Sequence, residues 1–257
     1  TEETAVRVDV VVEAPRERAF QVFTEEFDKV KPRDHTMLDA DNAAVTPALY
    51  AGATADDLIC VFAAIRSSGT GTLQTPTGYT RLPVFASTDN VQLFAKVHSG
   101  SESAPTVTPS GGSAGDSVSA LTFGLRGMPM SLADLADVVV DSATLLNSAA
   151  QNIAYPGLYP SLQEGCVVLA LGWKQDDWTS VATLSGMTEA ADVSTTTGND
   201  QGLVVDYVIQ TTPAVINESS FVVTGGAVAI SRGALVALAG GYQTFTISAR
   251  AVNGVTK

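Results

Sequence analysis

The most constraining feature of this sequence is an internal repeat. Residues 42–65 read NAAVTPALYAGATADDLICVFAAI, and residues 151–174, which begin 109 positions later, read QNIAYPGLYPSLQEGCVVLALGWK. The two stretches align without a gap, so that Tyr50 falls on Tyr159. The likeness continues in four further pairs of segments: 75–80 with 183–188, 91–97 with 203–209, 106–108 with 222–224, and 120–127 with 234–241. A repeat of this size predicts two copies of one structural unit.

The pattern within each copy predicts β-strands. From about residue 40 onward, short apolar and β-branched runs alternate with clusters of Gly, Pro, Ser, Thr and Asn, as strands alternate with turns. Residues 58–65 and 167–173 are apolar throughout, which is typical of strands covered on both faces and favours two copies that share one core. The predicted fold class is all-β: an internally duplicated β-sandwich or jelly-roll-like module with a short N-terminal strand-helix element.

The chain is expected to divide into four regions. Residues 1–39 are expected to form an N-terminal strand-helix arm, because a β-branched run at 6–12 is followed, after Pro15, by apolar residues at helical spacing. The other regions are a first β repeat at 40–127, a connector at 128–148, and a second β repeat at 149–257 that ends in a C-terminal strand. We expect the connector to be a short helix or a connecting strand. The run 242–251 is predicted to be an edge strand that docks on a neighbour or on its own sheet.

Charge and hydropathy restrict the partners that the chain can have. The sequence holds 14 Lys and Arg against 27 Asp and Glu, which gives a net charge of -13. Nucleic acid is an unfavourable partner because its phosphates need a basic footprint, and an anionic membrane surface repels the chain in the same way. No apolar run approaches the roughly 20 residues of a membrane-spanning helix. The chain opens without a signal-peptide pattern, so we expect synthesis in a cytoplasm.

The residues that usually carry catalysis are scarce, and the chain is therefore predicted not to be an enzyme. There are two histidines: His98 is expected in a surface turn after a strand, and His35 in a solvated loop. The Gly-rich stretches 67–71 and 110–115 lack the Lys and the helix that a phosphate-binding loop needs, so we interpret them as turns. Cys60 and Cys166 lie in apolar runs, and buried thiols are favoured over a disulfide between the two copies.

The candidate site is a group of acids and amides in the second copy. Trp173 and Trp178 flank a turn that contains two adjacent acids. Trp173 ends an apolar strand and is expected to be buried, whereas Trp178 is expected at the surface as a contact residue. The predicted surface-contact residues are Trp178, Asp176, Asp177, Asn199 and Asp200. These acids, with Asp206 nearby in the chain, are either plain solvated side chains or oxygen ligands for Ca²⁺, and we predict no metal and no other cofactor.

The opening of the chain resembles one known family. Residues 6–38 are similar to the first strand and helix of the helix-grip proteins, the START-like superfamily that includes the activator of Hsp90 ATPase. The likeness lies in Val12, Glu13, Ala14, Pro15, Glu17, Ala19 and Phe20. That family also needs a long C-terminal helix that grips a ligand cavity, and no such pattern follows downstream. The resemblance therefore implies a local strand and helix and no ligand binding.

The rest of the chain resembles the all-β structural proteins of tailed bacteriophages, of the minor tail, capsid decoration or fibre type. The phrases that carry this likeness are 55–66, followed by 68–70 and 76–80 in the first copy, and 172–178 in the second. The resemblance implies a non-enzymatic protein that is built into the virion in several copies. Its partners would be other virion proteins and copies of itself, and it would be assembled in the host cytoplasm.

Three functions follow from these observations. The first is a structural component of a bacteriophage particle, as a capsid decoration or minor tail protein, that acts through subunit contacts on the virion exterior. The second is an adhesion module that binds a host-surface glycan through the loops around Trp178 and Asn199. The third is a START-like binder of hydrophobic ligands, which the opening residues suggest.

Overall fold

The computed structural model describes nine stretches of the chain, the last of them for its backbone alone: residues 44–50, 52–66, 70–85, 90–113, 115–127, 135–158, 165–196, 198–239 and 249–255. The chain divides into two compact units, Thr1–Asp39 and Ala40–Lys257, and every described residue belongs to the second. The predicted strand-helix arm at 1–39 and His35 lie outside the described residues. The described part is all-β, with sixteen strands, one 3₁₀ turn named η1 (Leu135–Val138) and no α-helix.

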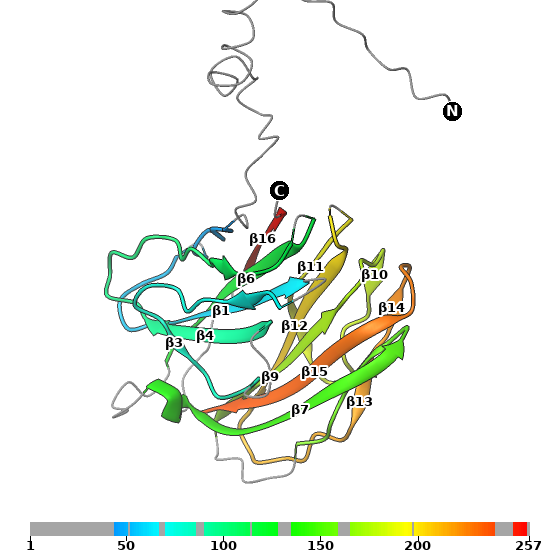
Figure 1. Cartoon of the computed structure of the whole chain (residues 1–257). Coiled ribbons are helices and arrows are strands. Elements are labelled where there is room, and N and C mark those ends of the chain that lie inside the picture. The colour runs from blue at the N-terminus through cyan, green and yellow to red at the C-terminus, as the bar shows by residue number, and fades with distance from the viewer. Residues whose placement is uncertain are drawn as a thin grey trace, which may run out of the picture. The chain divides into compact units, whose positions relative to one another are not determined.

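Two five-stranded antiparallel sheets form the body of this unit (Figure 1). The first sheet has the order β16-β6-β1-β4-β3, and its strands are β1 (Leu58–Arg66), β3 (Thr80–Arg81), β4 (Val91–Val97), β6 (Ser117–Leu125) and β16 (Ala249–Val255). The second has the order β11-β12-β9-β15-β7, and its strands are β7 (Val139–Ala150), β9 (Cys166–Lys174), β11 (Thr188–Thr195), β12 (Gln201–Gln210) and β15 (Ala229–Leu238).

Shorter two-stranded ladders lie outside the two large sheets. The ladder of the first half pairs β2 (Thr72–Leu73) with β5 (Pro109–Ser110). The two ladders of the second half pair β10 (Ser180–Val181) with β14 (Val223–Thr224), and β8 (Ile153–Tyr155) with β13 (Ser219–Phe221). Isolated bridges between Val45 and Val107 and between Leu158 and Ile216 extend these outer layers.

The two large sheets share one hydrophobic core. Because side chains alternate along a strand, Leu58, Cys60 and Phe62 of β1 point into this core, together with Leu169 and Leu171 of β9. The opposite face of each strand packs under an outer layer, β1 through Val61, Ala63 and Ile65, and β9 through Val168 and Ala170. The prediction that both strands are covered on both faces is confirmed. The residues of 58–65 and 166–173 are at most 1% exposed, apart from Gly172, which is also buried. Cys60 and Cys166 are buried and form no disulfide.

The connector contains a long strand rather than a helix. Of the region 128–148, the described part begins with η1 and continues as β7, which joins the open edge of β15. The C-terminal strand does not join the sheet that contains its preceding strand β15: β16 pairs with β6 of the first sheet, where Ala251 lies opposite Leu121. Of the predicted edge strand at 242–251, residues 242–248 lie outside the described residues.

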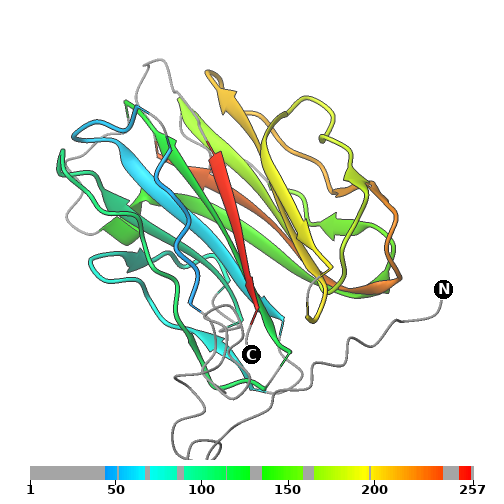
Figure 2. The same cartoon turned by 90° about the horizontal axis from the view of Figure 1, so that it is seen from above.

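The edge strands of the two sheets lie side by side on one side of this unit, and the edge strands on the other side differ in length. Figure 2 shows β16 in red between the blue-to-green strands of the first sheet and the yellow-to-orange strands of the second, and β16 lies beside β11. On the other side the first sheet ends in β3, which has only two residues. Pro83 follows closely after β3, and because proline donates no backbone hydrogen bond it cannot continue a ladder.

Candidate functional site

Three of the predicted site residues come together at one end of the second sheet. In the β9–β12 pair Lys174 lies opposite Gly202, so the turn after β9 and the loop before β12 emerge at the same end. The turn contributes Asp176 and Asp177 and the loop contributes Asp200, and one carboxylate oxygen of each lies within 4.8 Å of the others. Asp176 is 8% exposed, and the other two acids are partly exposed. Such oxygens are the ligands that hard cations such as Ca²⁺ prefer.

The surroundings of this acidic cluster already partly satisfy it. The backbone N–H of Ala227 donates to Oδ2 of Asp176. The ammonium group of Lys174 is buried without a hydrogen-bond partner, and its electrostatic partners are Asp176 and Asp177. Burial lowers the pKa of Lys174, and the two carboxylates oppose that shift. The positive charge of the Lys174 ammonium interacts with two of the three carboxylates and weakens their attraction for a metal cation.

Asn199 and Asp206, which the sequence also singled out, lie outside the acidic cluster. Asn199 lies in the loop before β12, where its Nδ2 donates to Oδ1 of Asp116 at 2.8 Å and its backbone N–H donates to the carbonyl of Gly115 at 2.7 Å. Ser117 donates to the Asn199 carbonyl. Asp206 is not part of the acidic cluster, because it lies inside β12 and accepts a hydrogen bond from the Leu184 N–H at 2.7 Å.

The loop before β12, together with Gln201 as the first residue of β12, thus bridges the two sheets. Gln201 donates through Nε2 to the Ser117 carbonyl at 2.7 Å and accepts from Nε1 of Trp173 at 2.9 Å, and all three side chains are almost fully buried. Arg66 at the end of β1 donates to the Asp200 carbonyl. A buried polar network of this kind fixes the position of one sheet relative to the other. The burial of Trp173 that the sequence predicts is confirmed.

The prediction that Trp178 lies at the surface is wrong. Its side chain is only 5% exposed, and its Nε1 donates to Oδ2 of Asp192 at 3.0 Å. The indole lies against Gly202 of β12, where a Cβ would come within 2.3 Å of the ring. The tryptophan is buried because the residue beneath it has no side chain. Trp178 therefore does not present an exposed face for a sugar or a partner subunit.

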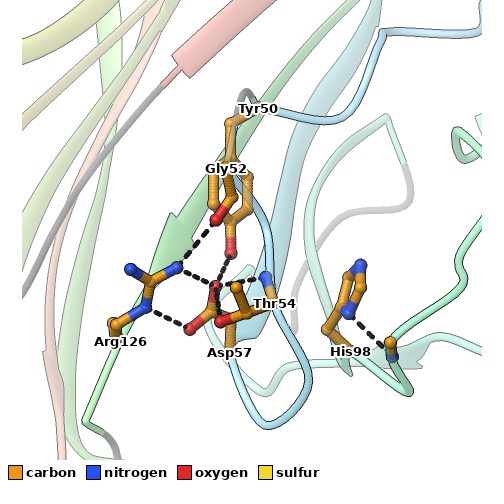
Figure 3. Close-up of polar contacts among 7 residues, drawn as sticks. Tyr50, Gly52, Thr54, Asp57, His98 and Arg126 are labelled. Atoms are coloured by element: carbon orange, nitrogen blue, oxygen red, sulfur yellow. Dashed lines mark hydrogen bonds and ion pairs between the residues drawn. The ribbon is translucent and has the colours of Figure 1, made fainter.

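His98 is also buried, contrary to the expected surface turn. It is 4% exposed, and its Nδ1 accepts a hydrogen bond from the Gly100 N–H at 2.9 Å (Figure 3). Its backbone exchanges two hydrogen bonds with the start of β1, from Asp56 N–H and to the Asp57 carbonyl. The ring is covered because these two backbone hydrogen bonds hold His98, the residue after β4, against the segment that leads into β1.

The sequence reasoning missed a buried ion pair in the first half. Asp57 is 2% exposed and accepts bonds of 2.9 Å from Nε and Nη2 of Arg126, in the bidentate geometry that favours an arginine–carboxylate pair (Figure 3). Tyr50 donates its hydroxyl to the same carboxylate at 2.8 Å, and Thr54 its backbone N–H at 2.9 Å. Arg126 also donates to the Gly52 carbonyl at 2.8 Å. The Asp57 carboxylate therefore ties the segment 50–54 to β1 and β6.

These contacts shift the pKa of two groups in opposite directions. Burial alone would raise the pKa of Asp57, but hydrogen bonds from Arg126, Thr54 and Tyr50 outweigh it and hold that pKa at about 2, below its ordinary value of 3.8. Burial is the largest cause for Tyr50, whose pKa is raised above its ordinary 10.0, with the adjacent Asp57 adding to the effect. Tyr50 is therefore a neutral hydrogen-bond donor, suited to holding the segment and not to proton transfer.

Two surface pockets occupy corresponding places in the two halves. One, of about 340 Å³, is lined by residues that include Thr77, Tyr79 and Lys96. The other, of about 370 Å³, is lined among others by Ser185, Met187 and Val208, the residues with which those three align. In the first pocket the Lys96 Nζ lies 2.5 Å from Oε2 of Glu102 and 5.9 Å from the centre of the Tyr79 ring, whereas Val208 and Met187, which align with Lys96 and Tyr79, are apolar.

Comparisons with known proteins add no relative. No protein-family model matches the chain, and neither a curated protein nor a solved structure does. The described residues also include no helical stretch of the length and apolarity that crossing a bilayer requires. The function is therefore argued from the residues and their arrangement.

Proposed function

We propose that this chain is a non-enzymatic structural component of a bacteriophage particle, a capsid decoration or minor tail protein that acts through subunit contacts on the virion exterior. Its fold, in this proposal, is a β-sandwich made by duplication of one unit. The observation that carries the proposal is that the two units share a single core.

The strand orders support the duplication. The first sheet contains β6-β1-β4-β3 and the second contains β15-β9-β12-β11, and each strand of the first set aligns in sequence with the strand at the same place in the second. The side chains of two of these strand pairs agree as well, whereas in β6 and β15 the sheet register differs from the sequence alignment by one residue. Phe62 of β1 and the aligned Leu171 of β9 point into the shared core, as do Leu93 of β4 and the aligned Val205 of β12. The outer ladders β2-β5 and β10-β14 also correspond.

The strand that follows each unit supports a single rigid body. β7 comes after the first unit but pairs with β15 of the second, and β16 comes after the second unit but pairs with β6 of the first. β16 of the second unit therefore completes the sheet of the first, and β7 of the connector completes the sheet of the second. An arrangement of this kind couples the stability of the two halves, because the first sheet keeps its fifth strand only when the second unit is present. Rigidity and coupling are useful in a virion building block and have no evident use in catalysis.

The charge agrees with an exterior position. A net charge of -13 repels packaged DNA, so the chain is best suited to the outside of a head or tail. The phage-like phrases of the sequence point to the same class of protein, and this class typically assembles in several copies around a symmetry axis.

The two other candidates have less support. The glycan-binding alternative relied on an exposed aromatic at Trp178, and that side chain is buried. The hydrophobic-ligand alternative relies on residues 6–38, which lie outside the described residues. Neither of these two pockets is lined by a helix, and the pocket of about 340 Å³ is lined by the Lys96–Glu102 ion pair, which is a poor surface for an apolar ligand.

The test is to locate the chain in particles. Particles purified from lysates of the producing culture are analysed by mass spectrometry for this chain and by electron microscopy with an antibody against it. The proposal expects stoichiometric, regularly spaced labelling of heads or tails. Particles that lack the chain should also lose stability to heat or to chelators. Absence of the chain from purified particles, or unchanged stability and infectivity without it, would rule the proposal out.

A further inference from the structure

Strand β7 is an open edge of the second sheet. It has 12 residues, and among the described strands its backbone pairs with β15 alone. In Figure 1 it is the long green strand that borders this sheet beyond the orange β15. Thr144, Leu145 and Leu146 in its middle are exposed, and Leu146 is 58% exposed. An edge of this length presents a row of backbone donors and acceptors that another strand can use.

The proposed duplication explains why this edge is open. β16 is the counterpart of β7, and β16 has β11 beside it, a strand of eight residues. The counterpart of β11 is β3, which has two residues because Pro83 follows closely. The loop after β3 contacts β7 where Thr144 donates its hydroxyl to the Val84 carbonyl at 2.9 Å. β11 covers the edge of the first sheet, whereas its counterpart β3 is too short to cover the edge of the second.

The composition of β7 is unusual for an edge that has to stay single. Protected edges carry lysines, prolines or inward-pointing charges, whereas VVDSATLLNSAA contains one charged residue, Asp141, and neither Lys nor Pro. The exposed large hydrophobic side chains also gather here. Of the seven in the described residues, four lie on β7 or at the start of β15: Leu145, Leu146, Val228 and Ile230. This near-neutral stripe is where two copies of a chain with net charge -13 can approach with the least repulsion.

We propose that β7 is the site at which a second copy of this chain docks, by antiparallel pairing of β7 with the partner's β7 about a two-fold axis. The two five-stranded sheets then form one continuous ten-stranded sheet. Pairing about the middle of the strand places Asp141 of each copy opposite the region of Ser148 in the other, which keeps the two carboxylates apart. This inference rests on the proposed function only in that a virion building block assembles from several copies.

The first test measures the oligomeric state of the full chain. Sedimentation equilibrium over a range of concentrations should show a monomer–dimer equilibrium for the natural chain. Leu146→Lys places a charge at the centre of the contact and should raise the dimer dissociation constant at least about tenfold. Because Leu146 is more than half exposed, the variant is expected to fold, and circular dichroism checks this. Val222→Lys, at a similarly exposed position outside β7, is the matched control and should leave the dissociation constant unchanged.

The second test reads the geometry directly. Single cysteines are introduced at each position from 143 to 148, and disulfide dimers are counted after mild oxidation. Antiparallel self-pairing predicts a maximum at one position near the strand centre and a decline on both sides. The natural thiols are buried and give no background. A chain that stays monomeric, or a dimer that Leu146→Lys leaves intact, overturns the inference. Particle labelling decides the proposed function separately, so either can fail alone.

Discussion

The two halves of the molecule use the same backbone connection and different side chains to hold it. At the entry to β1, the N–H of Asp56 donates to the His98 carbonyl at 2.9 Å. At the entry to β9, the N–H of Gly165 donates to the Gln210 carbonyl, also at 2.9 Å. The next residue is where they part: Asp57 in the first half aligns with Cys166 in the second. One side chain is an ionised acid with an arginine partner, and the other is a buried thiol.

The outer layers are held by correspondingly different means. In the first half the segment 44–54 is tied to the sheet by the Asp57 carboxylate and by Thr122, whose hydroxyl donates to the Ala48 carbonyl at 2.5 Å. In the second half β8 presses directly on the sheet, and a Cβ on Gly233 would come within 2.2 Å of the Ala154 carbonyl oxygen. The comparison indicates that the first half depends on a polar clamp and the second on close backbone approach.

The largest effect should come from placing a methyl group in the close contact between β15 and β8. Gly233→Ala places a methyl group against backbone that cannot rotate away, and we expect a loss of about 3–4 kcal/mol in the free energy of unfolding. By sheet register the matched change in the first half is Ala120→Gly, because Ala120 lies opposite Ala63 as Gly233 lies opposite Gly172, one residue away from the alignment of 120–127 with 234–241. It should cost only about 1 kcal/mol, through the chain entropy of glycine. Urea unfolding measures both, and equal losses would show that the halves are packed alike.

The second effect concerns the polar clamp. Asp57→Ala leaves the Arg126 guanidinium and the Tyr50 hydroxyl without their shared acceptor, so we expect a loss of about 2–3 kcal/mol. The figure is below that of a fully buried pair because the Arg126 side chain is 43% exposed. Glu218→Ala removes an exposed carboxylate from the other half as a control and should change stability by less than about 0.5 kcal/mol. If the loss in the double variant Asp57→Ala/Arg126→Ala equals the sum of the two single losses, the two side chains do not act as a pair.

The third prediction uses pH to separate the halves. The pKa of Asp57 is held at about 2 against its ordinary 3.8, so its contribution is present above about pH 4 and is lost as pH falls through 2. Asp206 behaves in the opposite sense. Burial is the main cause that raises its pKa to about 6, with Glu189 and Asp192 adding to it and the Leu184 N–H opposing, so the folded state binds a proton that the unfolded chain has released. Stability should therefore fall as pH rises from about 4 through 6.

Asp206→Asn tests this assignment. The amide oxygen can still accept the Leu184 N–H, and no charge is buried, so the variant should be more stable than the natural chain by about 2 kcal/mol near neutral pH. Its stability should also be flat between about pH 4 and pH 6, where that of the natural chain declines. Denaturant unfolding at several pH values measures both curves. A variant that is less stable near neutral pH would mean that the Asp206 carboxylate has a partner that stabilises its charge.

Local patterns predicted the parts of this molecule that local patterns determine. The continuous apolar runs at 58–65 and 167–173 indicated doubly covered strands and a shared core, because burial on both faces leaves no polar position in a strand. The crossing of β16 to the first sheet left no such mark, since its sequence suits an edge strand on either sheet. The Asp57–Arg126 pair was missed because the register that places Leu58 opposite Leu125 brings together residues 69 positions apart.

The candidate site was predicted unevenly for the same reason. Acids in two loops were expected near one another, and the β9–β12 pairing brings Asp177 and Asp200 together. Trp178 was misplaced because its acidic neighbours suggested a solvated turn. What decides its burial is Gly202, a residue on another strand that leaves room for the indole. Sequence neighbours indicate the chemistry of a loop, but its burial depends on the strand that it packs against.

The smallest effect should be that of calcium on the acidic cluster, which has no counterpart among the described residues of the first half. Three carboxylates would normally favour Ca²⁺, but Asp176 already accepts the Ala227 N–H, and the Lys174 ammonium is buried with Asp176 and Asp177 as its electrostatic partners. A cation would have to approach that ammonium or expel its proton. We therefore expect about 5 mM CaCl₂, which saturates typical extracellular sites, to shift the melting temperature by less than about 1 °C. A rise of several degrees that saturates with calcium and disappears in Asp177→Asn would show that the carboxylates outweigh the lysine.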